Sequence, residues 1–226
     1  MLKYANNIYS QFGEDGILEY LINILEIQTG ECCEVGMQGT LYSNTFNLIQ
    51  NKNWFGVWVE TNRDNLINLN QYKEKYRVDI IDAFVEKTGE CSLDNLLSKT
   101  KLSKNFDVLS IDIDGNDYHI WDSLKNYNPK IVIIEINPFY KPGVEYVHNG
   151  SIYGSSFTSM VNLGLDKGYT LISMTGNLVF IKSELLKNTE LENYINLNPN
   201  DLFLDDAIAI NKREITFRRY MKRTLI

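Results

Sequence analysis

The chain has 226 residues, of which 44% are hydrophobic and 23% are charged, and this predicts one globular domain with a sizeable core. Its formal net charge of −7 argues against a general nucleic-acid binder, which needs a basic face for the phosphates. Residues 212–226 carry six basic residues against one acidic residue. We expect a solvated helix there, and contact with a membrane surface or a partner is the alternative.

The three cysteines include the adjacent pair Cys32 and Cys33, and they form neither a disulfide framework nor a set of metal ligands. The first residues lack the apolar core of a secretion signal, and no uninterrupted apolar stretch approaches the roughly 18 residues of a transmembrane helix. We therefore expect a cytoplasmic protein without a transmembrane segment. The sequence leaves its oligomeric state open.

Short apolar runs alternate with helical patterns along the chain. An amphipathic helix is predicted first, at 15–27, and Ser92 is the predicted cap of a later short helix. The five strands that follow the first helix are predicted at 32–36, 55–60, 76–81, 106–114 and 130–136. Because these strands are apolar on both faces and alternate with helices, they predict a doubly wound parallel α/β sheet.

The last part of the chain has a different pattern. A helix at 156–168 precedes two apolar runs, 169–174 and 178–182, which are joined by a short turn containing Gly176. Two strands joined in this way form a hairpin, so the last strand runs antiparallel to its neighbour. The predicted sheet therefore has seven strands and is mostly parallel.

Ligands of such a sheet bind at the carboxyl ends of the strands. The first strand ends in EVGMQGTLYSNT, where Gly36 permits close approach of the backbone and where Ser43 and Asn44 stand near a helix start. Glu34 occupies the position of the first glycine in a dinucleotide-binding G-x-G-x-x-G motif. An acid there repels pyrophosphate and favours a cationic ligand.

The next two strand ends also carry acids. Glu60 ends the second strand, where an acidic residue accepts the hydrogen bonds of a ribose diol. Asp82 and Ala83 end the third strand and are candidates for the adenine, through a carboxylate and a backbone amide. Together the three strand ends favour an adenosine with a cationic tail, S-adenosylmethionine.

Five segments in this order resemble the FkbM-type class I S-adenosylmethionine-dependent methyltransferases: EVGMQGTLYSNT, GVWVE, SLDNLL, LSIDIDGNDYHIW and IVIIEINP. The resemblance covers about residues 9–182, and it implies a Rossmann-like methyltransferase fold. YSQFGEDG and DIDGND are similar to a subgroup from bacterial capsule and surface-polysaccharide clusters. The family's usual lysine is Ser110 here, and its two glutamates are Asp114 and Asp117.

The resemblance implies roles for single residues. Gln11 closes over the cofactor, and Asp112 lies near its sulfonium end. The other cofactor contacts that it implies are Gly36, Ser43, Asn44, Glu60, Asp82 and Ala83. Glu34 is a further candidate, from the strand end alone.

Acceptor binding and catalysis are assigned to the loop after the fifth strand and to the end of the fourth. His148 is the candidate base, since a hydroxyl acceptor gains from proton removal. Asp114 is the second catalytic candidate. Its alternative roles are to bind a metal or only to shape the turn. A polar, anionic or nucleotide-linked acceptor is expected to contact Asn137, Tyr140, Lys141, Tyr146 and Tyr153.

We expect no bound metal. The alternative is Mg²⁺ on an all-oxygen site made by Asp112 or Asp114 with Glu135 and Asn137. A carboxylate that faces a cationic cofactor explains Asp112 without a metal.

The expected organisation is an N-terminal segment over the cofactor site (1–30), a methyltransferase domain (31–185) and an extension with a basic tail (186–226). The expected activity is O-methylation of a capsule or surface-polysaccharide precursor, at a sugar hydroxyl or a phosphoramidate oxygen. A nicotinamide-dependent sugar oxidoreductase and a non-catalytic adaptor with the methyltransferase fold are the alternatives.

Overall fold

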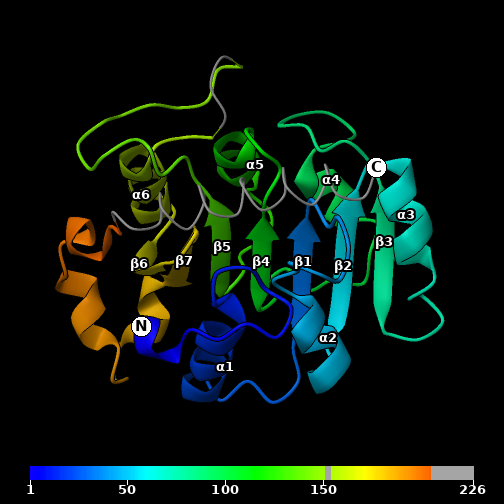
Figure 1. The fold of residues 1–226 in the computed structure, drawn as a ribbon, viewed down its shortest axis with the longest axis horizontal. Helices are drawn as coiled ribbons and strands as arrows, with labels where there is room; N and C mark the ends of the chain where they lie inside the picture. The colour runs from blue at the N-terminus through cyan, green and yellow to red at the C-terminus, as the bar shows by residue number, and fades with distance from the viewer. Residues whose placement is uncertain (151–153, 205–226) are drawn as a thin grey trace, which may run out of the picture.

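The computed structural model describes residues 1–150 and 154–204. The described chain forms one seven-stranded sheet with the strand order β3-β2-β1-β4-β5-β7-β6, which Figure 1 shows face on. All neighbouring strands pair in parallel except β7, which is antiparallel to both β5 and β6. The predicted doubly wound, mostly parallel seven-stranded sheet with a terminal hairpin is confirmed. Tyr153 and the basic tail lie outside the described residues.

The strands are short, and all except the edge strand β3, which is mostly half-buried, are almost wholly buried. Their bounds are β1 Glu31–Val35, β2 Phe55–Glu60, β3 Val78–Asp82, β4 Val108–Ile111, β5 Ile131–Glu135, β6 Tyr169–Met174 and β7 Asn177–Lys182. The α-helices are α1 Glu14–Ile24, α2 Phe46–Lys52, α3 Arg63–Asn70, α4 Leu93–Leu97, α5 Asp117–Ser123 and α6 Phe157–Asp166. Short 3₁₀ helices lie at Leu2–Tyr4, Ser183–Leu186, Glu192–Asn196 and Pro199–Leu202.

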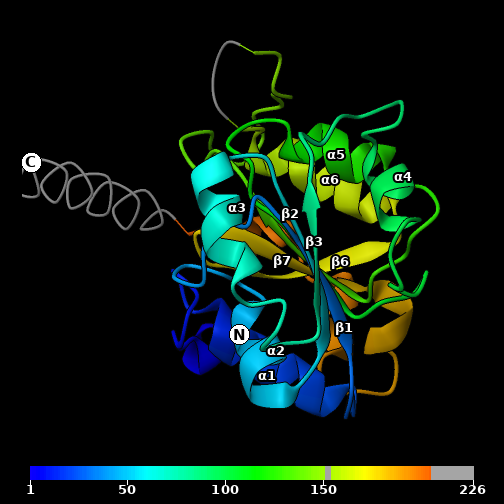
Figure 2. The ribbon, with the colours of Figure 1, turned by 90° about the vertical axis from the view of Figure 1, so that its right-hand side faces the viewer.

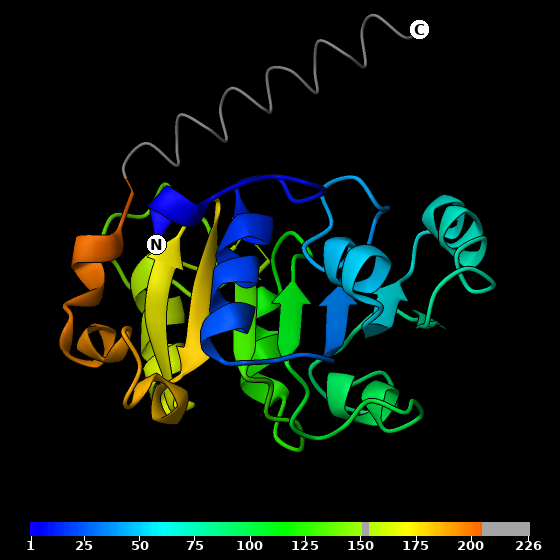
Figure 3. The same ribbon diagram turned by 90° about the horizontal axis from the view of Figure 1, so that it is seen from below.

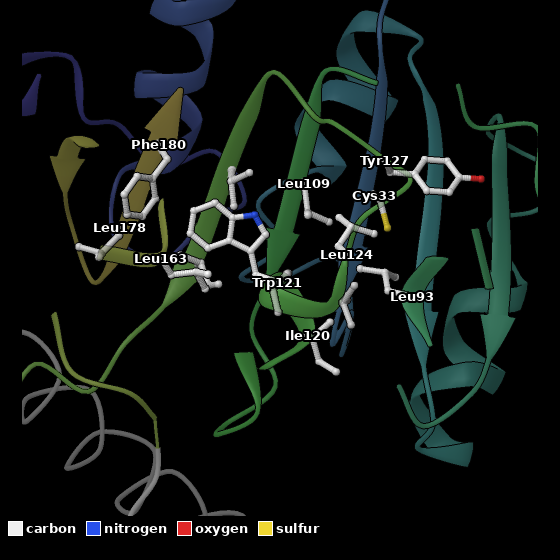
Figure 4. Packing of buried hydrophobic residues seen from close by; sticks show 14 of the residues in the cluster. Cys33, Leu93, Leu109, Ile120, Trp121, Leu124, Tyr127, Leu163, Leu178 and Phe180 are labelled. Atoms are coloured by element: carbon white, nitrogen blue, oxygen red, sulfur yellow. The ribbon is translucent and has the colours of Figure 1, made fainter. Parts of the chain in front are cut away.

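The helices cover both faces of the sheet. Figures 2 and 3 show α1, α2 and α3 on one face and α4, α5 and α6 on the other. Each face has its own apolar cluster, because the strands between them are apolar on both sides. Trp58 and Ile17 belong to the first cluster, whereas Trp121 and Phe180 belong to the second and lie against each other in Figure 4.

Some local predictions differ from the structure. The fourth strand, predicted at 106–114, spans only Val108–Ile111, so Asp112 and Asp114 lie in the turn that follows it. Ser92 occupies the N-cap position of α4, but its side chain makes no capping hydrogen bond, so the predicted role of its oxygen is wrong. The first helix begins one residue earlier than predicted and ends at Ile24, before the left-handed residue Glu26 (φ 53°). No helix in the described ranges is both long and apolar enough to cross a membrane.

Candidate functional site

A cavity of about 490 Å³ opens at the carboxyl ends of β1, β4 and β5. The order of the strands reverses between β1 and β4, which is the place where open α/β sheets bind ligands. Five segments contribute to its wall: 11–12, 34–43, 112–114, 135–139 and 176–177. In the described part of the chain, four acids and no Lys or Arg line it.

Gly36 sets the distance between the loop after β1 and the end of β4. Its φ is +89°, and a Cβ there would collide with the carbonyl oxygen of Asp112. The Gly36 N–H donates to the carbonyl of Val59 on β2. Glycine is therefore required for close approach between two parts of the protein backbone, at the edge of the cavity.

Glu34 holds the loop that leads into α2. Its carboxylate accepts the Ser43 hydroxyl at 2.6 Å, the Thr45 hydroxyl at 2.6 Å and the backbone N–H of Asn44 at 3.0 Å. Burial raises the pKa of Glu34, although these hydrogen bonds oppose the rise. Glu34 lines the cavity, as the prediction of a cofactor contact requires, and it also positions Ser43, which lines the cavity beside it.

Asn44 lies beneath the cavity wall. Its side-chain N–H donates to the hydroxyl of Ser110 on β4 at 3.0 Å, and both residues are buried. Ser110 thus receives a hydrogen bond from the loop after β1. The predicted role of Asn44 as a cofactor contact stays a prediction, because its side chain is used inside the protein.

The turn after β4 is fixed by Asp117, the first residue of α5. Its two carboxylate oxygens accept the backbone N–H groups of Ile113 and Gly115, each at 2.9 Å. Asp117 is fully buried, which raises its pKa to about 6. Asp114 lies between these two anchored residues with φ +57°, in the left-handed region that non-glycine residues rarely adopt.

Three carboxylates meet at the cavity floor. One oxygen each of Asp112, Asp114 and Glu135 lies within 4.8 Å of the others. Burial, and after it the charges of Asp117, Asp114 and Glu34, raises the pKa of Asp112 to about 7. Burial, and after it the charges of Asp112, Asp117 and Asp114, raises the pKa of Glu135 well above its ordinary value.

The N-terminal loop forms one wall through Gln11 and Phe12. Asp15 anchors this loop, because one of its carboxylate oxygens accepts three consecutive backbone N–H groups, those of residues 8–10, at 2.7 to 2.8 Å. Glu14 accepts the N–H of Phe12 at 2.9 Å. The first two residues of α1 therefore hold Gln11 at the cavity, where the resemblance places it.

Glu14 also joins the N-terminal loop to the hairpin of β6 and β7. Its other oxygen accepts the Thr175 hydroxyl at 2.6 Å and the Asn177 side-chain N–H at 3.3 Å. Between them lies Gly176, at which a Cβ would collide with the ring of Phe12. Phe12, Gly176 and Asn177 all line the cavity, and sequence reasoning missed all three. The hairpin was the available signal, because an antiparallel last strand begins at the edge where its parallel neighbours end.

The predicted adenosine contacts lie at the same edge of the sheet but outside the cavity wall. Glu60 accepts the N–H groups of Thr61 and Asn62 at 2.6 and 2.7 Å and thereby shapes the turn into α3. The N–H of Ala83 donates to the Glu60 carbonyl at 3.0 Å. Asp82 is exposed beside them and lines a second cavity, next to Lys73 and Lys99.

The loop after β5 brings one predicted acceptor contact, Asn137, to the cavity. Tyr140 and Tyr146 stack on each other at 4.9 Å between ring centroids, and the Lys141 ammonium lies 5.4 Å from the ring of Phe203. None of these three belongs to the cavity wall.

His148 lies beside the turn after β4. A Cβ at Gly115 would be 3.0 Å from its Nε2, so the imidazole packs on the glycine that follows Asp114. Its carbonyl accepts a hydrogen bond from His119 Nε2 at 2.8 Å. The two candidate catalytic residues are thus brought close together, although only Asp114 lines the cavity.

Comparison with models of protein families found no match, and comparison with curated proteins found none either. Solved structures with a similar chain path include the N-terminal domain of EvdMO1 with SAH bound, at 10% identity over 74% of this chain and 78% of that chain, TM-score 0.47. A S-adenosylmethionine-dependent methyltransferase from Clostridium acetobutylicum ATCC 824 is 11% identical over 77% and 91% of the two chains, TM-score 0.47. A SAM dependent methyltransferase from Aquifex aeolicus is 11% identical over 75% and 87%, TM-score 0.45. Activity therefore has to be argued from the site itself.

Proposed function

We propose that the chain is an S-adenosylmethionine-dependent O-methyltransferase. The observation that supports this most is the cavity at the strand-order reversal, which in the described residues is lined by four acids and no base. S-adenosylmethionine carries a sulfonium and an ammonium group. At roughly 4 Å, an opposite unit charge attracts such a group by about 4 kcal/mol at an effective dielectric constant near 20.

The same observation argues against the nicotinamide alternative. A dinucleotide brings a pyrophosphate to the loop after β1, and Glu34, near the end of β1, lines the cavity there. The carboxylates of Asp112 and Asp114 lie on the neighbouring strand end. Their charge would repel a pyrophosphate as strongly as it attracts a sulfonium.

Bound S-adenosylmethionine supplies a methyl group that an acceptor oxygen can displace from sulfur. The chain contributes alignment: Gly36 lets the loop after β1 approach the end of β4, and Phe12 with Gly176 closes the opposite wall. A hydroxyl acceptor must lose its proton, and the carboxylates of Asp112, Asp114 and Glu135 are the groups in the cavity wall that can take it. His148 packs outside the described wall and is the weaker candidate base.

We infer that the acceptor is a hydroxyl of a surface-glycan precursor. The negative charge of the cavity supports a neutral hydroxyl over an anionic phosphoramidate oxygen, because the acids would repel an anionic acceptor. The exposed side chains of Leu41 and Phe139 at the wall offer apolar contact to the carbon face of a sugar ring. The capsule context rests on the resemblance of YSQFGEDG and DIDGND.

Calorimetry in the presence of a chelator tests the cofactor. We expect S-adenosylmethionine and S-adenosylhomocysteine to bind and NAD not to bind. Asp112→Asn should weaken S-adenosylmethionine at least about 10-fold, which corresponds to about 1.4 kcal/mol, a fraction of the attraction above. Asp122→Asn on the exposed part of α5 is the matched control, since it removes the same charge away from the cavity.

Two results would contradict the proposal. One is the absence of heat with both sulfur compounds. The other is an affinity for S-adenosylmethionine that Asp112→Asn and Asp122→Asn leave equal to that of the natural chain.

A further inference from the structure

Three carboxylates lie close together on the cavity floor. Asp112 and Asp114 come from the turn after β4, and Glu135 ends β5, which pairs with β4 in parallel register. One oxygen of each lies within 4.8 Å of the others. No Lys or Arg among the described residues lines the cavity to balance them. Like charges at this distance repel unless a cation or protons neutralise them.

Glu135 provides a second, independent observation. Its Oε2 is buried from solvent and finds no hydrogen-bond partner in the described part of the chain. A buried polar atom without a partner is costly, and native proteins rarely leave one unexplained. Glu135 lines the cavity beside Asp112. A ligand bound between these carboxylates would therefore supply the partner that this oxygen lacks.

The turn that carries Asp114 is held in place before any ligand arrives. Asp117 fixes it through the N–H groups of Ile113 and Gly115. Asp114 itself is exposed, so water reaches the open side of the cluster. A small divalent cation keeps several of its waters and binds only a few carboxylates of the protein. This suits a cluster whose turn is anchored by hydrogen bonds and whose open side is exposed to water.

The geometry points to a divalent-cation site: Asp112, Asp114 and Glu135 bind one oxygen-preferring cation, Mg²⁺ or Mn²⁺, on the cavity floor. All three ligands are hard oxygen donors, which suits these cations and not Zn²⁺. Asn137, which belonged to the alternative Mg²⁺ site predicted from the sequence, is not among these ligands, and its side-chain oxygen accepts the N–H of Phe139 at 3.0 Å. The site goes beyond the proposed function and does not depend on it.

Titration of the full chain with Mn²⁺ alone tests this inference. The protein is first stripped with a chelator and dialysed, and free Mn²⁺ is followed by electron paramagnetic resonance. We expect one Mn²⁺ per chain, displaced by excess Mg²⁺. Glu135→Gln and Asp112→Asn should each weaken Mn²⁺ at least about 10-fold, because each removes one of three charged ligands. Asp122→Asn is again the matched control, and its affinity should equal that of the natural chain.

The inference is overturned if no Mn²⁺ binds up to about 1 mM, the weak end of protein sites for divalent cations. It is also overturned if Glu135→Gln binds Mn²⁺ as the natural chain does, because the ion then lies elsewhere or the cluster holds only protons. If a buried variant fails to fold by circular dichroism, the exposed Asp114→Asn decides by the same criterion. Calorimetry with S-adenosylhomocysteine in the presence of a chelator tests cofactor binding without a metal. A failure of the proposed function can therefore be told apart from a failure of the metal site.

Discussion

Thr175→Val tests the junction between the N-terminal loop and the β6–β7 hairpin. The substitution keeps the shape of the side chain and removes the hydroxyl that donates to the buried carboxylate of Glu14 at 2.6 Å. It also removes the acceptor of the Asn177 backbone N–H at 3.2 Å. A hydrogen bond to a charged group contributes about 1.5 to 3 kcal/mol, so we expect a loss of about 2 kcal/mol in the free energy of unfolding.

Thermal unfolding measures this loss. In a chain of this size, 1 kcal/mol corresponds to about 2 to 4 °C, so Tm should fall by about 4 to 8 °C. Because Phe12, Gly176 and Asn177 line the cavity, the affinity for S-adenosylhomocysteine should fall several-fold as well. Thr170→Val is the matched control, since the Thr170 hydroxyl bonds to Ser183 at 2.7 Å at the other end of β6. The reasoning is refuted if Thr175→Val has the same Tm as the natural chain. It is also refuted if Thr170→Val lowers the affinity for S-adenosylhomocysteine as much as Thr175→Val does.

Two further predictions concern buried acids. Glu34→Ala leaves the hydroxyls of Ser43 and Thr45 and the N–H of Asn44 without their acceptor. The free energy of unfolding, measured in urea, should therefore fall by more than about 3 kcal/mol. A loss below about 1 kcal/mol would show that these groups find other hydrogen-bond partners. Burial raises the pKa of Glu14 above its ordinary 4.5, so the stability due to its proton is present at low pH and is lost as the pH rises through the raised pKa. Glu14→Gln should therefore flatten the fall of Tm with rising pH above about 4.5, and an unchanged slope would assign the effect to other groups.

The sheet was predictable from the sequence because its strands are apolar on both faces. Apolar residues such as Val57 and Ile133 are buried in the strands, so the pattern indicates helices on both faces of the sheet. The turn at Gly176 indicated the antiparallel direction of the last strand. The edge of the sheet that carries the site followed from this topology alone. The place of Glu34 in the cavity wall followed from the same rule, whereas that of Asp112 followed from the resemblance.

The details of the site depended on contacts between distant segments. The role of Glu60 as a ribose contact stays a prediction. Its carboxylate accepts two N–H groups of its own turn, those of the following residues Thr61 and Asn62. The position of Tyr140 and Tyr146 depends on the bridge between Asn137 and Ser156, far apart in sequence. No local pattern encodes such a path, so the loop could not be placed in advance.

The bond between Glu14 and Thr175 joins residues that are 161 positions apart. During synthesis on the ribosome, the N-terminal loop leaves the exit tunnel long before its partner in the hairpin exists. The wall formed by Phe12 and Gly176 can close only after the β6–β7 hairpin has been made, and the entropy of a long loop must then be overcome. A nascent chain that ends before β7 should therefore be unable to retain a ligand, so binding to stalled nascent chains of increasing length would report when the molecule becomes competent.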